Sequence, residues 1–405
     1  MPAVSAAGPP PSTSGAPPRP DDVPAGGLFD WPGRINVFRY GLTEFSDLFT
    51  DRQLVALTTF SDLVGEARER VLADARAAGM PDGDRLESSR TANGAEAYAD
   101  AVATYLGLAV SRVTDIGNGL CRWENTKEQV RNLFGRQAIP MLWDYAETPP
   151  LHEAAAGGFT VSLGNLVKTI RMAGTGGSYV RQADASRRSY ERVLISTDPP
   201  YYDNIGYSDL SDFFYVWLRR SLRSVHPSLL GTMLVPKAEE LVANPYRHDG
   251  KDGAKRFFED GFRQVFARAR ESAIEDYPIT VYYAFKQSES SLDGVSSSGW
   301  ETLLEGMIRS GWAITSTWPM RSELTNRMIA SGTNALASSI VLSLRPRPAG
   351  APTTDRRGFI SALQAELPDA LRKLQQGSIA PVDLPQAAIG PGMAVFSRYS
   401  GVIEP

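Results

Sequence analysis

The sequence contains one cysteine, Cys121, and three histidines in 405 residues. A single cysteine excludes internal disulfides and a cysteine-rich zinc site. The histidines, His152, His226 and His248, are scattered without the spacing of metal ligands, so we predict no metal site. No uninterrupted apolar run approaches the ~20 residues that cross a bilayer, and the N-terminus has no basic region followed by an apolar core. These absences predict a cytoplasmic protein.

The sequence also lacks an excess of positive charge. The 42 Lys and Arg residues are outnumbered by 46 Asp and Glu residues, which gives a net charge of −4. Nucleic-acid binders that depend on counterion release usually carry a basic excess or a basic face, so any contact with DNA must be local. The composition, 42% hydrophobic and 22% charged, is typical of a soluble globular protein with a sizeable core.

Composition divides the chain into four regions. Residues 1–27 are rich in Pro, Ala, Gly and Ser and are predicted to be a disordered tail or linker. Residues 28–150 carry mainly helical patterns and form a candidate substrate-recognition insertion. Residues 151–345 alternate strands with helices and are predicted to form an α/β core, whereas residues 346–405 form a C-terminal extension.

Periodic apolar positions locate the expected elements. The predicted helices are one capped by Asp51, then Ala95–Asp115, Glu128–Leu142, Thr160–Met172, Asp209–Val225, a Phe-rich helix before Asp276, Gly299–Arg309 and Phe359–Leu374. The predicted strands are Ser178–Gln182, Val193–Thr197, Ile279–Phe285, Trp312–Trp318 and Ala337–Leu344. This alternation predicts a mostly parallel sheet whose last two strands form an antiparallel edge. Gly390-Pro391-Gly392 is predicted to be a turn.

Three aromatic residues flank the predicted helix at 128–142. Trp123, Trp143 and Tyr145 are expected to pack in the core, as most aromatic residues in helical regions do. The alternative places Trp143-Asp144-Tyr145 beside a base that has been extracted from a duplex.

The most informative stretch is Val193–Thr197 followed by Asp198-Pro199-Pro200-Tyr201. A short apolar strand here ends in an acid, two prolines and an aromatic residue. In an open α/β sheet, ligands bind at the carboxyl ends of strands, where Asp198 is predicted to lie. A carboxylate and a neighbouring backbone carbonyl can both accept hydrogen bonds from an exocyclic amino group, and Tyr201 could stack on its base. A strand followed by a structural Pro-Pro turn is the alternative.

The Asp198-Pro199-Pro200-Tyr201 sequence after an apolar strand resembles the catalytic motif of DNA methyltransferases that use S-adenosylmethionine to modify amino groups, especially adenine N6. More widely, the chain resembles a large bacterial family of adenine-specific methylases that carry an N-terminal domain of unknown function and occur in phage-defence settings. The residues that carry the resemblance are 198–205 (DPPYYDNI), 207–220 (YSDLSDFFYVWLRR), 280–286 (TVYYAFK), 317–321 (TWPMR), 334–341 (NALASSIV) and 388–394 (AIGPGMA).

The resemblance implies a Rossmann-like methyltransferase sheet, S-adenosylmethionine as cofactor and DNA as partner. It assigns the catalytic motif to Asp198, Pro199, Pro200 and Tyr201, the neighbourhood of the cofactor's adenine to Asp184 and Ala185, and weaker substrate contacts to Tyr202, Asn204 and Lys286. Two of these residues have ordinary alternatives. Asp184 could simply cap a helix, and Lys286 could be a solvated strand end.

One element of such an enzyme is missing. A methyltransferase of this fold begins with a strand and a Gly-rich turn that approaches the cofactor. The candidate here, Ala173–Ser178, follows a helix and leads into a strand, which is the reverse of the required order. Members of the family are longer and carry the Gly-rich element upstream. The chain therefore resembles the C-terminal portion of a split or truncated methylase, and an upstream chain is expected to carry the Gly-rich cofactor motif.

A second class of function remains open. The chain could be a non-catalytic, methyltransferase-like DNA-binding or scaffold subunit of a defence system. Arg219, Arg220 and Arg223 could then contact phosphates, although such clusters are usually solvated faces. RNA or protein as the methyl acceptor is a third alternative.

Overall fold

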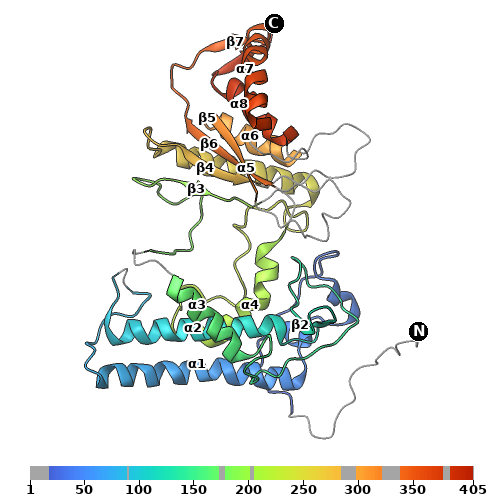
Figure 1. Cartoon of the computed structure of the whole chain (residues 1–405), viewed down its shortest axis with the longest axis vertical. Helices are drawn as coiled ribbons and strands as arrows, with labels where there is room; N and C mark the ends of the chain where they lie inside the picture. Colours follow the sequence, from blue (N-terminus) through green and yellow to red (C-terminus); the bar gives the residue numbers. More distant parts are fainter. Residues whose placement is uncertain are drawn as a thin grey trace. The chain divides into compact units, whose positions relative to one another are not determined.

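A computed structural model describes residues 18–88, 91–172, 178–200, 205–283, 298–321, 338–376 and 384–404. The chain is a mixed α/β protein that divides into two compact units (Figure 1). Unit 1 consists of Met1–Gln182 and Tyr207–Ala238, and unit 2 consists of Ala183–Gly206 and Glu239–Pro405. Each unit is thus built from two separate segments of the chain.

Unit 1 is mainly helical. Its elements are η1 (Asn36–Tyr40), η2 (Phe45–Leu48), α1 (Asp51–Ala77), α2 (Gly94–Ile116), β1 (Arg122–Glu124), β2 (Gln129–Arg131), α3 (Phe159–Met172) and α4 (Tyr207–Leu222). The long helices α1 and α2 run side by side (Figure 1). Apolar residues at helical spacing, among them Leu54, Leu57 and Val64, are buried along α1 because they form one face of that helix.

Helix α1 begins with a reciprocal cap at Thr50, one residue before the predicted cap. The Thr50 hydroxyl accepts from the Gln53 N–H, and the Gln53 side chain accepts from the Thr50 N–H. We expect Thr50→Ala to lower the free energy of unfolding by about 1 kcal/mol, because one helix N–H loses its acceptor. Urea unfolding followed by circular dichroism measures this. Thr59→Ala, within the same helix, is the control, and an equal loss there would contradict a capping role.

Two parts of unit 1 differ from the sequence predictions. The predicted helix at 128–142 is wrong: β1 and β2 form an antiparallel hairpin with Trp123 opposite Val130, and Glu128 turns the chain with a left-handed φ of 49°. Residues 18–27, part of the predicted disordered tail, contact the rest of unit 1. The Arg19 guanidinium donates to the Ser46 hydroxyl at 2.8 Å, and Gly27 forms a β-bridge with Glu44. Residues 1–17 lie outside the described residues.

The main sheet of unit 2 has the order β3-β4-β6-β5. Its strands are β3 (Ser196–Thr197), β4 (Ile279–Tyr283), β5 (Trp312–Arg321) and β6 (Ser338–Pro346). The pair β3–β4 is parallel, whereas β4–β6 and β6–β5 are antiparallel. The antiparallel edge formed by the last two strands is confirmed, but the expectation of a mostly parallel sheet is wrong for the described strands.

Helices α5 (Gly250–Glu271) and α6 (Ser298–Arg309) supply the core on one face of this sheet. Phe258, Phe262 and Phe266 of α5 are buried in the same cluster as Val281 of β4 and Leu342 of β6. The predicted Phe-rich amphipathic helix is therefore confirmed. Its spacing of four residues places the three rings on one side of α5.

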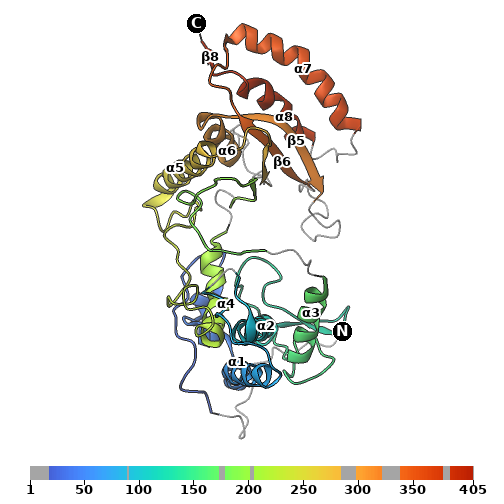
Figure 2. The same ribbon diagram turned by 90° about the vertical axis from the view of Figure 1, so that its left-hand side faces the viewer.

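The C-terminal part of unit 2 contains α7 (Arg356–Gln376), α8 (Leu384–Ser397), and the parallel pair β7 (Thr353–Asp355) and β8 (Gly401–Ile403). Helices α7 and α8 pack together, and α8 lies against β5 (Figure 2). The predicted turn at Gly390-Pro391-Gly392 is wrong, because these residues lie within α8. A Cβ atom at Gly390 would lie 1.8 Å from the Thr317 hydroxyl oxygen, so glycine permits this close helix–strand contact.

Two predicted strands also differ. Residues 178–182 form no strand, and Val180 is 93% exposed in unit 1. The predicted strand at 193–197 is shortened to its last two residues. The apolar pattern predicts that Val193 and Leu194 are buried, but both are exposed, and the exposed fraction of Leu194 is 65%.

Candidate functional site

Strand β3 carries Asp198-Pro199-Pro200 at its carboxyl end, as the sequence predicts. The Thr280 N–H donates to the Ile195 carbonyl at 3.0 Å, and Ser196 and Thr197 lie opposite Thr280 and Val281 in the parallel ladder. The chain leaves the sheet at Asp198. Pro199 and Pro200 are half-buried, and their rings fix φ, so the position of the carboxylate is restricted locally.

The Asp198 carboxylate is exposed and has no hydrogen bond or ion pair within the part of the chain that the structure describes. Partial burial raises the pKa of the Asp198 carboxyl above its ordinary value, and no neighbouring cation offsets this effect. Its oxygens are consequently available to an external donor. Tyr201, Tyr202, Asn204 and Lys286 lie outside the described residues, so their predicted contacts stay predictions.

Asp184 and Ala185 are engaged in a local turn. One Asp184 carboxylate oxygen accepts from the Ser186 N–H at 2.8 Å and from the Ser186 hydroxyl at 2.7 Å. These bonds, with the nearby Arg187 guanidinium, hold the pKa of Asp184 below its usual range. The Ala185 carbonyl accepts from the buried Tyr190 hydroxyl at 2.8 Å. This geometry matches the structural alternative for Asp184, a cap of the following turn.

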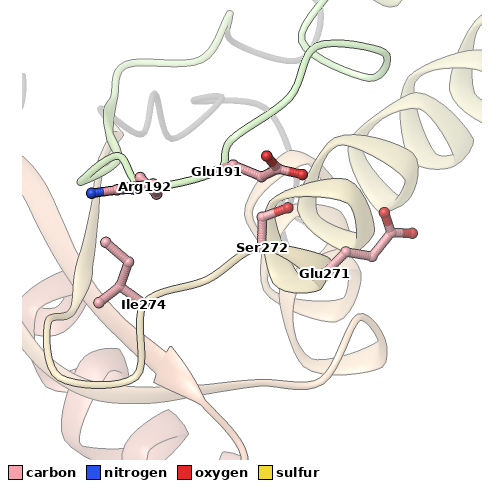
Figure 3. Close-up of a pocket in the computed structure, with 5 residues that line it drawn as sticks. All are labelled: Glu191, Arg192, Glu271, Ser272 and Ile274. Carbon is pink, nitrogen blue, oxygen red and sulfur yellow. The ribbon is translucent and has the colours of Figure 1, made fainter.

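A hollow of about 650 Å³ lies at the opposite end of β3. It is lined by Glu191, Arg192, Glu271, Ser272 and Ile274 (Figure 3). These residues precede β3 and β4 in the chain, and the two strands are parallel. The hollow is therefore at the amino ends of the strands, whereas Asp198 lies at the carboxyl end, where α/β sheets bind ligands.

The aromatic residues that were expected in the core are exposed in unit 1. Trp143 is 81% exposed and contacts Tyr40 edge-to-face, with ring centroids 5.4 Å apart. The Tyr145 hydroxyl bonds Glu147, which pairs with Arg52. The core-packing prediction is wrong for Trp123, Trp143 and Tyr145, because the segment that carries them is a hairpin and loop instead of a helix.

One member of the predicted arginine cluster, Arg220 on α4, has a structural role. The Arg220 guanidinium donates to Asp62 of α1 and to Asp22 of the N-terminal segment, with 2.9 Å bonds to each carboxylate. Arg220 thus connects three segments of unit 1.

Among the described residues, no group of three or more His, Cys, Asp or Glu side chains could hold a metal ion, and no helix is long and apolar enough to cross a membrane.

The described residues do not form a complete cradle for S-adenosylmethionine. Among the described residues, the strand that carries Asp198 is at the edge of its sheet, so a strand end lies beside Asp198 on one side only, that of β4. The carboxylate of Asp184, the acid assigned to the cofactor's adenine, already accepts a hydrogen bond from Ser186 and pairs with Arg187. Comparison with family models, with curated proteins and with solved structures finds no match to this chain.

Proposed function

We propose that this chain supplies the part of an S-adenosylmethionine-dependent adenine-N6 DNA methyltransferase that holds the target amine. The observation that carries the proposal is the position of Asp198-Pro199-Pro200 at the carboxyl end of β3, with an exposed carboxylate that has no hydrogen bond or ion pair among the described residues. The resemblance of this motif to amino-methyltransferases assigns the reaction, and the chain corresponds to the C-terminal part of a split or truncated enzyme.

The chemistry of Asp198 suits this role. An amino group offers N–H donors, and an ionised carboxylate is an acceptor with two oxygens. Held between Asp198 and a backbone carbonyl of the motif, the amine nitrogen would be oriented with its lone pair toward an incoming methyl group, and orientation is a major source of rate enhancement. A charge-assisted hydrogen bond would also stabilise positive charge that develops on that nitrogen.

The order of the strands supports the Rossmann-like part of the proposal. Strands β3 and β4 are parallel, and the chain between them includes α5, as in a βαβ unit of a doubly wound sheet. The antiparallel β6 is inserted between β4 and β5. Mixed sheets of this kind are common among doubly wound folds. On this proposal, the four described strands correspond to the second half of a methyltransferase sheet.

The isolated chain is expected to show no saturable binding of S-adenosylmethionine at micromolar concentration, because its sequence has no Gly-rich turn directly after a predicted strand. Residues 173–177 of the one Gly-rich candidate, Ala173–Ser178, lie outside the described residues. Isothermal titration calorimetry with the full chain measures this. Sinefungin, an analogue that cannot transfer a methyl group, is the control for turnover during the titration. Micromolar binding by the chain alone would contradict the requirement for an upstream chain.

The second candidate is a non-catalytic DNA-binding or scaffold subunit. It is favoured by the local engagement of Asp184, which leaves this acid to a structural turn. Transfer of a labelled methyl group to adenine in duplex DNA, by the chain together with the polypeptide encoded immediately upstream, separates the two candidates. Transfer supports the enzyme; DNA binding without transfer supports the scaffold. RNA and protein substrates in the same assay test the other acceptors.

A further inference from the structure

Unit 1 exposes a group of aromatic side chains. We name Tyr40, Trp123, Trp143 and Tyr145 the aromatic platform; their exposed fractions are 55%, 46%, 81% and 37%. Among the described aromatic residues, none is more exposed than Trp143. Tryptophan is usually buried over most of its surface, and exposed apolar groups that gather in one place mark interaction sites. The platform is therefore a candidate surface for a ligand.

The four rings come from three segments that direct contacts hold together. Tyr40 and Trp143 meet edge-to-face. The Asp144 carboxylate accepts from the Trp123 N–H at 3.0 Å and from the Tyr145 N–H at 2.9 Å, so one side chain joins the hairpin to the loop that follows it. Hydrogen bonds thus position the platform, and its rings are left largely uncovered.

The backbone fixes the same segments. The Ile139 N–H donates to the Arg34 carbonyl at 2.7 Å, and the Asn36 N–H donates to the Ile139 carbonyl at 3.0 Å, which connects the loop to η1. Farther along, the Ala146 N–H donates to the carbonyl of Cys121, the residue before β1, at 3.0 Å. A surface that is already ordered loses little conformational entropy when it binds a ligand.

The carboxylates that adjoin the platform are already engaged. Asp144 accepts the two N–H groups described above. Glu147 pairs with Arg52, and Glu124 pairs with Arg131 at 2.7 Å. These acids therefore have partners inside unit 1 that offset their charge.

Two arginines at the border of the platform differ from these acids. Arg39 directly precedes Tyr40, and Arg122 directly precedes Trp123. Both side chains are exposed, and neither guanidinium group has a hydrogen bond or ion pair within the part of the chain that the structure describes. The border of the platform is thus complementary to an anionic ligand.

Aromatic faces beside unpaired cations suit a single-stranded nucleic acid. Every base has a π-face, and stacking of one base on an aromatic side chain changes affinity by about 5- to 150-fold. The bases of a duplex are stacked on one another and would first have to be extracted. The net charge of −4 also provides no extended basic surface for a duplex. An unpaired strand fits this platform better than a duplex does.

We infer that the aromatic platform binds unpaired bases of a single-stranded nucleic acid, while Arg39 and Arg122 contact the phosphates beside those bases. The inference goes beyond the proposed function, because it requires neither Asp198 nor a methyl donor. Proline-rich peptides are another common ligand of exposed aromatic side chains. The two unpaired guanidinium groups favour the nucleic acid, because a proline-rich peptide has no phosphates to neutralise them.

Fluorescence anisotropy of the full chain with labelled strands of about 12 nucleotides tests the inference. Single-stranded DNA or RNA should bind at least about tenfold more tightly than a duplex of the same sequence. Trp143→Ala should weaken single-strand binding at least about tenfold, because a stacking surface is lost. Trp143→Phe keeps a ring and should stay within about threefold of the original affinity. The tighter of the DNA and RNA strands identifies the preferred ligand.

A second aromatic residue has a matched control in the same unit. Tyr40→Ala should weaken single-strand binding at least about fivefold. Tyr98 has a similar exposed fraction, 51%, but lies near the start of α2, whereas the chain after the hairpin contacts the end of α2 through the Leu133 N–H and the Asp115 carbonyl. Tyr98→Ala should therefore leave the affinity unchanged. Circular dichroism checks that each variant is folded.

The dependence on salt tests the two arginines. Arg39→Gln and Arg122→Gln should each weaken single-strand binding about threefold. Each should also reduce the slope of log affinity against log salt concentration by about 0.7, the value for one phosphate contact with a single strand. An unchanged slope in both variants would exclude the phosphate contacts.

Four results would overturn the inference. They are equal or tighter binding of the duplex, an affinity that neither Trp143→Ala nor Tyr40→Ala changes, binding of a proline-rich peptide without binding of either single strand, and loss of single-strand binding in Asp198→Ala. Single-strand binding that persists in Asp198→Ala would support the platform. Platform-dependent binding by a chain that shows no methyl transfer would keep this inference and reject the proposed enzyme.

Discussion

Asp198→Ala is expected to lower methyl transfer by the assembled enzyme by about 10²–10³-fold, a loss typical for removal of one positioned polar group that acts on the transition state. The substitution removes the only charged acceptor of the motif. Because Asp198 is exposed and has no ion pair among the described residues, its loss should leave the stability of the fold nearly unchanged. Single-turnover methylation of duplex DNA measures the effect.

Two further variants make this experiment specific. Asp198→Asn keeps the shape and one acceptor oxygen, so it should retain more activity than the alanine variant. Asp369→Ala removes an exposed acid that pairs with Arg372 on α7 and should not change the rate. DNA affinity should be equal in all three proteins. Full activity of Asp198→Ala would exclude the proposed role of this carboxylate.

The dependence on pH gives an independent readout of Asp198. Its pKa is raised by partial burial, and the ionised form is the acceptor. On acidification the carboxylate should therefore be protonated at a higher pH than an ordinary aspartate, whose pKa is about 3.9. The rate should rise with pH through this raised pKa, and Asp198→Asn should lack that part of the profile.

The second large effect is expected on stability, at Asp100 in unit 1. This fully buried carboxylate on α2 accepts from the Arg68 Nε of α1 at 2.6 Å, from Arg85 at 3.3 Å and from the Leu86 N–H at 3.1 Å. Asp100→Ala should lower the free energy of unfolding by about 1–3 kcal/mol, because it removes the buried acceptor of the Arg68 Nε and the Leu86 N–H, although Arg68 keeps its ion pairs with Glu69 and Glu96. Urea unfolding measures the loss.

A control and a pH series accompany this variant. Asp82→Asn breaks an exposed pair with Arg76 and should cost less than about 1 kcal/mol. Burial opposes ionisation of Asp100, but hydrogen bonds from Arg68 and Arg85 prevail and lower its pKa. Its stabilisation is therefore present above the unfolded-state pKa and is lost as pH falls through the native value. A loss below 1 kcal/mol in Asp100→Ala would show that the ion pairs of Arg68 with Glu69 and Glu96 are sufficient for stability.

Long periodic patterns predict most of the helices of the described chain, but not α8. Helix α2 was predicted as Ala95–Asp115 and spans Gly94–Ile116, because its apolar face repeats over six turns. The segment at 128–142 could not be assigned in this way. Val130 in this segment pairs with Trp123 of β1 in a hairpin. The periodicity of apolar residues within 128–142 does not predict such a contact with a residue outside the segment.

For the site, the sequence predicted the position of Asp198 from the strand that precedes it, and β3 confirms that position. It did not predict that Val193 and Leu194 would be exposed. An apolar run indicates burial, but it does not identify the element that would cover those residues. Nor could it decide between a cofactor contact and a local turn for Asp184. The local turn is identified by the hydrogen bond from the Ser186 hydroxyl to the Asp184 carboxylate. A serine two residues after an aspartate does not by itself distinguish a turn from a cofactor site.

The division of the chain has a consequence for its biosynthesis. Unit 1 is completed by Tyr207–Ala238, which follow the segment that carries Asp198. The chain therefore passes between the units three times, at 182–183, 206–207 and 238–239. During translation, unit 1 is complete only after residues 207–238 have left the ribosome, and residues 183–206 leave before them. Both ends of segment 183–206 are then joined to unit 1 before residues 239–405, the rest of unit 2, have been synthesised. A single proteolytic cut within that segment would leave the two units covalently joined.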